Sequence, residues 1–160
     1  LLIRIFIFIY QKMNAEAVEI YFHIEKPLQY EIKQENLIKK VLLKTIAAEN
    51  YELECLNFIL CTDEYLHKMN VQYLQHDTLT DVITFDNSET AKEIAGDIFI
   101  SLERVAENAN IFETTTEKEL RRVILHGTLH LLGYKDKSET EQQMMRQKED
   151  YYLDFFKTLN

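Results

Sequence analysis

Residues 126–137 read HGTLHLLGYKDK, and this stretch fixes where a buried helix ends and how the chain turns back over it. Its leucines predict a segment packed in the core, and Gly133 fits the left-handed position that terminates a helix. His126 and His130 lie four residues apart inside the apolar run. Their imidazoles must therefore find partners in the core or share one ligand.

Two capping motifs frame this stretch. Thr116 and Glu119 match the capping box that opens a helix, so the helix with the histidines is expected to run from Thr116 to Gly133. Ser138 and Glu141 match the same box and predict a polar C-terminal helix that extends to about residue 157.

The rest of the chain alternates between strand and helix patterns. Short runs of β-branched and aromatic residues predict strands at VEIYFHI (18–24), LNFIL (56–60), DVITF (81–85) and GDIFIS (96–101). Helical spacing and cap residues predict helices at 34–49, at 63–70 with Asp63 as its N-cap, and at 102–110 with Ser101 as its N-cap. This order predicts a single α/β (α+β) domain, with helices packed on a small mixed β-sheet.

The composition is that of a folded, acidic chain. Its 160 residues suffice for one domain with its own core. The net charge of −9 argues against binding nucleic acid by overall charge, so such binding would need a local basic patch or a partner. Cys55 and Cys61 are separated by six residues of predicted strand, roughly 20 Å, which is too far for a disulfide. Both cysteines are therefore expected to be reduced, as in a cytoplasmic protein.

The first residues differ from the rest. LLIRIFIFIY is apolar but too short to cross a bilayer, and no cleavage site follows it. We interpret residues 1–12 as an upstream extension or misplaced start, with membrane targeting as the alternative. Residues 13–160 are expected to form the domain, and no membrane partner is expected.

His126 and His130 share one face of the predicted helix, because positions i and i+4 lie one turn apart. Both can reach one metal ion, and Asp136 follows the glycine turn closely enough to supply a third ligand, which leaves an open position as in catalytic zinc sites. The alternative is two histidines satisfied in the core; the spacing and the nearby carboxylate favour the metal. A zinc peptidase of the HExxH type is disfavoured, because Gly127 stands where that motif has its general base.

Three motifs together resemble one known family. HGTLHLLGYKD (126–136) is similar to the HGxLHLxGYDH signature of the YbeY family of endoribonucleases. TDVITF (80–85) and AGDIFIS (95–101) are similar to two further motifs of that family, in the same order and at the same separation. The resemblance covers about residues 13–158 and implies a YbeY-like metal-dependent hydrolase domain over residues 13–160.

This resemblance implies a zinc-dependent endoribonuclease specific for single strands, with one Zn²⁺ per chain. Its implied substrate is a ribosomal RNA precursor, in 3′ end maturation of the small-subunit RNA and in ribosome quality control, with the ribosome or ribosomal proteins as partners. Two positions depart from the family pattern. Asp136 replaces the third histidine, which makes the site more negative, and Leu74 replaces an arginine expected to hold RNA phosphate.

Two arginines precede the histidines by one helical turn. Arg122 is a candidate for catalysis and, with Arg121, for binding a substrate phosphate. The alternative for each is an ion pair along the helix, Arg121 with Glu117 or Arg122 with Glu119. The sequence does not separate these interpretations.

Three further residues are weaker candidates. Lys39 lies on a basic helix edge that could contact phosphate, although a solvated face is the usual meaning of such a run. Asp97, and less strongly Asp81, are the nearest candidates for a proton acceptor by resemblance. Their alternative role is to brace the ends of the strands that carry them.

Two other functions compete with RNA cleavage. The acidic charge and Leu74 favour a non-catalytic, zinc-containing ribosome-assembly factor. A metal hydrolase of another phosphoester also fits, because a fold and a metal site do not fix a substrate.

Overall fold

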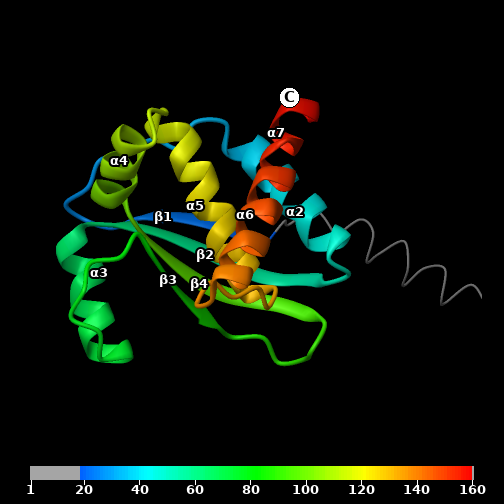
Figure 1. Ribbon diagram of the computed structural model, residues 1–160, viewed down its shortest axis with the longest axis horizontal. Coiled ribbons are helices and arrows are strands. Elements are labelled where there is room, and N and C mark those ends of the chain that lie inside the picture. The colour runs from blue at the N-terminus through cyan, green and yellow to red at the C-terminus, as the bar shows by residue number, and fades with distance from the viewer. Residues whose placement is uncertain (1–18, 160) are drawn as a thin grey trace, which may run out of the picture.

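A computed structural model of the chain describes residues 19–159 (Figure 1). The strands are β1 (Ile20–Ile24), β2 (Glu52–Cys61), β3 (Val82–Asp86) and β4 (Glu93–Ser101). The helices are α2 (Glu35–Ala48), α3 (Asp63–Met69), the π-helical turn η1 (Asn70–Leu74), α4 (Leu102–Ile111), α5 (Thr116–Leu131), α6 (Glu139–Leu153) and α7 (Phe155–Thr158). The interpretation of residues 1–12 lies outside the described residues.

The sheet is mixed, as predicted. Its strand order is β1-β2-β4-β3, in which β1, β2 and β4 are parallel and β3 runs antiparallel to β4. Figure 1 shows α5 lying across the sheet, with α6 and α7 beside it and α3 at the opposite side of the fold. The expected single domain of helices on a small mixed sheet is confirmed. No helix within residues 19–159 is long and apolar enough to cross a bilayer.

The close packing of α5 on the sheet depends on Gly127. A Cβ atom built there would lie 2.7 Å from Cγ2 of Ile98 on β4 and 3.3 Å from Cγ2 of Val82 on β3. The face of α5 that carries Gly127 therefore touches the sheet, and its neighbour His126 is directed elsewhere. A glutamate at this position would point into the core and could not act as a base.

Gly127→Ala is expected to lower the free energy of unfolding by about 1–3 kcal/mol, because the new methyl group overpacks the contact with Ile98. The branched side chain of Ile98 cannot swing its Cγ2 away without moving its whole rotamer. Urea unfolding of the two proteins measures the loss, provided that the free energy of unfolding falls with urea concentration at the same slope in both. An unchanged midpoint would mean that α5 can lift from the sheet without cost, which contradicts this packing.

Two predicted helix starts are wrong by one residue. Thr62, rather than Asp63, caps α3 and accepts a hydrogen bond from the Tyr65 amide. Thr115, rather than Thr116, caps α5 and accepts from the Lys118 amide. In both cases the capping residue is the one with extended backbone angles.

The other helix ends follow the predictions more closely. Ser101 caps α4, and Ser138 with Glu141 forms the complete capping box of α6. Gly133 has φ +97°, the left-handed value predicted for the end of α5. The predicted single C-terminal helix is instead divided at Asp154 into α6 and α7.

Candidate metal centre

Three side chains that can bind a metal converge where α5 ends. Nε2 of His126 lies 3.0 Å from Nε2 of His130. Oδ2 of Asp136 lies 3.7 Å from the first of these nitrogens and 3.5 Å from the second. Among residues 19–159, these three form the one group of His, Cys, Asp or Glu side chains that could share an ion. The structure thus brings together the three ligands expected from the sequence.

The turn after α5 brings Asp136 to the histidines. The Gly133 amide donates to the carbonyl of His130, and the Tyr134 amide donates to the carbonyl of Leu129, each at 3.0 Å. This pair of bonds is the Schellman motif, which requires the left-handed backbone that glycine adopts without strain. The chain therefore reverses at once, and the Asp136 side chain, 43% exposed, reaches the histidines from the solvent side.

The remaining nitrogen of each imidazole is also engaged. Nδ1 of His126 lies 2.5 Å from Oε1 of Glu149, and Nδ1 of His130 lies 3.0 Å from the carbonyl oxygen of Tyr134. A carboxylate and a carbonyl can only accept, so each Nδ1 carries the proton and each Nε2 presents a lone pair. Burial and the neighbouring His126 lower the pKa of His130 below its ordinary value, which favours this neutral form.

The donor set fits a divalent cation. Two lone pairs and a carboxylate oxygen face one another within 3.7 Å. Acceptors crowded in this way repel unless a cation lies between them. Imidazole nitrogen and carboxylate oxygen are ligands that zinc accepts, and the three leave a fourth position free.

Glu149 belongs to a partly buried charge network centred on Arg122. The guanidinium donates to both oxygens of Glu119 at 3.0 Å and to Glu149 at 3.3 Å, and it lies 3.5 Å from Asp81. Glu119 and Glu149 are 2% and 5% exposed. Burial lowers the pKa of Arg122, but the hydrogen bonds that it donates to Glu119 and the charge of Glu149 outweigh this effect and raise the pKa. Arg122 therefore stays charged and neutralises the carboxylates around it.

The other basic candidates have partners outside the triad. Arg121 donates to the side-chain oxygen of Gln34, and Lys39 pairs with Glu35 at 2.7 Å. Arg121 lines the pocket described below, and Lys39 does not. The predicted alternative for Arg122, an ion pair with Glu119, is present, and Glu119 is its buried member.

The two aspartates do not share one site. A Cβ atom on Gly96 would meet Leu131 of α5, so Asp97, the next residue of β4, faces away from α5. Its carboxylate accepts hydrogen bonds from Asn57 at 2.9 Å and Asn87 at 3.1 Å. Asp81, in contrast, lies in the same pocket as His126.

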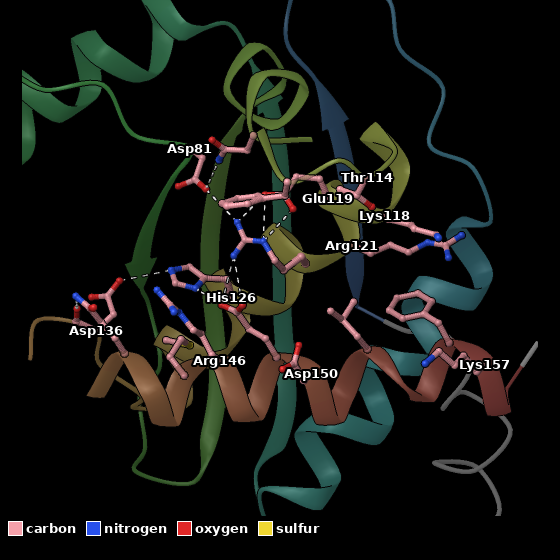
Figure 2. A pocket seen from close by; sticks show the side chains of 18 residues that line it. Asp81, Thr114, Lys118, Glu119, Arg121, His126, Asp136, Arg146, Asp150 and Lys157 are labelled. Atoms are coloured by element: carbon pink, nitrogen blue, oxygen red, sulfur yellow. Dashed lines mark hydrogen bonds and ion pairs between the residues drawn. The ribbon is translucent and has the colours of Figure 1, made fainter. Parts of the chain in front are cut away.

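A pocket of about 970 Å³ extends from the metal ligands along α6. Figure 2 shows His126 and Asp136 at one end, Lys157 at the other, and Arg146 and Asp150 rising from α6 between them. Asp81 and residues of α5 form the opposite wall. The candidate metal centre is thus one end of a larger concave surface.

Sequence reasoning missed Glu149 and Arg146. Glu149 follows Met145 by four residues and precedes Tyr152 by three, and both of these are buried. An acidic residue in the apolar stripe of a helix indicates a buried partner, so this signal was present in the sequence. Arg146 carries no such signal, because it is an exposed residue on a polar helix.

Comparisons with known proteins agree with this site. Residues 19–157 match the family model described as Endoribonuclease YbeY. The Endoribonuclease YbeY of Cytophaga hutchinsonii is 48% identical over 141 residues, which cover 88% of this chain and 96% of that protein. The Endoribonuclease YbeY of Flavobacterium psychrophilum is 49% identical over 129 residues, 81% of this chain and 91% of that protein.

The fold has a solved counterpart as well. The solution structure of a Thermotoga maritima protein aligns with a TM-score of 0.57 at 29% identity, and the alignment covers 84% of this chain and 88% of that one. The family model and these relatives span nearly the whole described chain, including the three converging ligands. This chain belongs to the YbeY family of endoribonucleases.

Proposed function

We propose that this protein is a zinc-dependent endoribonuclease that cleaves single-stranded regions of ribosomal RNA precursors during maturation of the small-subunit 3′ end and in ribosome quality control. Membership of the YbeY family supports RNA phosphodiester bonds as the substrate. The observation that carries the proposal is the set of three metal-binding atoms facing one another at the end of a pocket.

One zinc ion per chain is proposed, held by His126, His130 and Asp136. Zinc in such a site supplies Lewis-acid activation of water and of a phosphoryl oxygen. The carboxylate of Glu149 and the carbonyl of Tyr134 keep the Nδ1 protons in place, so that both Nε2 atoms stay available. Three ligands with an open side are typical of catalytic sites, whereas structural zinc sites are closed by four.

The other candidate residues take supporting roles in this proposal. Arg122 positions Glu149 and Glu119, and through Glu149 it positions His126. Arg121 lines the pocket and is placed to contact substrate. Asp97 braces the opposite face of the sheet through its two asparagine partners.

The proposed setting is the cytoplasm, with the ribosome or ribosomal proteins as partners. The cysteines support a reducing compartment, because neither of the two is in a disulfide. Cys55 and Cys61 are free thiols, and burial raises the pKa of Cys61 to about 12, so that this thiol stays protonated.

Metal content tests the proposal first. Elemental analysis of the purified protein is expected to give about one zinc per chain, and Asp136→Ala is expected to lose most of it, because two ligands bind far more weakly than three. Cleavage of single-stranded RNA should require the bound zinc and stop when it is chelated. A parent protein that binds no metal after zinc is supplied at neutral pH would contradict the proposal.

Glu149→Gln is expected to weaken zinc binding roughly tenfold, because it replaces the carboxylate that orients His126 with a weaker acceptor. Competition with a chromogenic chelator measures the affinity. Asp150→Asn is the matched control, since it removes the same charge from the neighbouring, exposed position. Equal affinities for the two variants would show that Glu149 acts through charge alone and does not position the histidine.

A further inference from the structure

The pocket beside the candidate metal centre contains cations that the fold leaves without partners. Arg146 and Lys118 both line it, and both are exposed. Neither forms an ion pair with any residue in the described range 19–159.

Two of the pocket's other cations are neutralised by carboxylates, and the third, Arg121, is hydrogen-bonded to a neutral side chain. Arg122 is enclosed by carboxylates, Arg121 donates to Gln34, and Lys157 pairs with Asp154 at 2.6 Å. The positive charge that no carboxylate neutralises is therefore concentrated at two places, next to the candidate metal ligands and on the first two turns of α5, where Arg121 also lies. Figure 2 shows Arg146 extending from α6 on the side of His126 and Asp136, with Lys118 farther along the same hollow.

An exposed aromatic ring lies on the same surface. Phe112, at the end of α4, lines the pocket and is 61% exposed. Surfaces that bind single-stranded nucleic acid combine cations along the backbone with aromatic rings on which bases stack. A pocket of about 970 Å³ is of the size that encloses a small ligand, which suits a few nucleotides of one strand rather than a duplex.

We propose that this pocket is the path of the single RNA strand next to the cleavage site. Arg146 contacts the phosphate nearest the metal centre, Lys118 contacts a phosphate farther along the strand, and Phe112 stacks on a base. The proposal rests on the endoribonuclease function above, and it assigns substrate contacts to α6 and to the end of α4, which the sequence motifs do not include.

Binding of a fluorescent single-stranded DNA, which an endoribonuclease leaves intact, tests the path in the zinc-loaded protein. The variant Arg146→Gln/Lys118→Gln is expected to bind roughly a hundredfold more weakly, with the slope of log affinity against log salt reduced by about 1.4 for two lost phosphate contacts. Lys26→Gln/Lys40→Gln is the matched control, because it removes two exposed cations outside the pocket. It should change binding less than twofold.

Two further variants probe the stacking contact and the sign of the charge effect. Phe112→Ala should weaken binding roughly tenfold, whereas Ile111→Ala, an equally exposed neighbour outside the pocket, should not. Asp150→Asn, which removes an exposed carboxylate from the pocket, should strengthen binding.

The outcomes separate this proposal from the proposed function. If the parent cleaves RNA but the pocket variants bind like their controls, the path is overturned and the nuclease assignment stands. If binding depends on Arg146 and Lys118 but no RNA is cleaved, the path is supported and the nuclease assignment fails. A duplex that competes as well as the single strand would overturn the path.

Discussion

Replacing His126 by alanine is expected to lower the rate of RNA cleavage by roughly a thousandfold or more, because activation of water by zinc supplies most of the catalysis at such sites. The fold should survive. Without the imidazole, Glu149 still has Arg122 as its partner, so no buried charge is left unpaired. The substitution also removes one of the three acceptor atoms that repel one another in the metal-free site. Cleavage of single-stranded RNA by the two proteins, at equal zinc concentration, measures the loss.

A stability measurement accompanies the activity assay. Zinc at a hundredfold excess over its dissociation constant should stabilise the parent by about 2.7 kcal/mol and leave His126→Ala almost unchanged. His76→Ala is the control, because His76 is exposed and lies outside the pocket. Cleavage retained by His126→Ala in the presence of a chelator would exclude the metal mechanism.

Arg122→Ala is expected to lower the free energy of unfolding by about 3–5 kcal/mol, the cost of breaking a buried ion pair from one side. The substitution leaves Glu119 and Glu149, both buried, without the cation that neutralises them. Urea unfolding of the zinc-free protein measures the change without a contribution from metal binding. Combining Arg122→Ala with Glu119→Gln should recover part of the loss, because one unpaired carboxylate is removed.

The neighbouring arginine provides the control for this prediction. Arg121→Ala loses a hydrogen bond to Gln34 and a contact of its guanidinium with the Phe156 ring at 4.8 Å, which together contribute about 1 kcal/mol. If Arg122→Ala keeps the stability of the parent but loses affinity for RNA, then Arg122 contacts substrate phosphate and its structural role is wrong.

A non-catalytic assembly factor predicts different results for the same proteins. In that case zinc removal would unfold the chain, and His126→Ala would have no cleavage activity to lose. The open side of the triad, where Asp136 is exposed, argues for catalysis, because structural zinc sites are closed. Action on another phosphoester is tested by comparing the cleavage rates of phosphoesters of different length. A hydrolase of a small phosphoester should cleave a short substrate as fast as an RNA strand.

Local sequence was sufficient to predict those parts of the candidate site whose contacts join residues close together in the chain. The i,i+4 spacing placed His126 and His130 on one face, and Gly133 placed the turn that brings Asp136 back to them. These features follow from helix geometry and from the left-handed backbone of glycine, both of which act within one or two turns. The convergence of these three candidate ligands could therefore be predicted without a structure.

Longer-range contacts could not be predicted in this way. Glu149 is separated from His126 by 23 residues, and its role depends on how α6 packs against α5. Asp81 and Asp97 both end or border predicted strands, and the sequence does not say which face of the sheet α5 covers. Only the packed sheet places Asp81 in the pocket and Asp97 on the opposite face.

The amino-acid sequence alone predicted the family, the mixed α/β fold and the three candidate metal ligands. The packing of the helices on one another sets what surrounds them: the partner of each imidazole, the enclosure of Arg122 by carboxylates, and the unpaired cations Arg146 and Lys118. The three candidate ligands come from one helix and the turn after it, so local backbone geometry sets their positions. The electrostatic environment of the site depends on the charges of many side chains, which come together only when the chain folds.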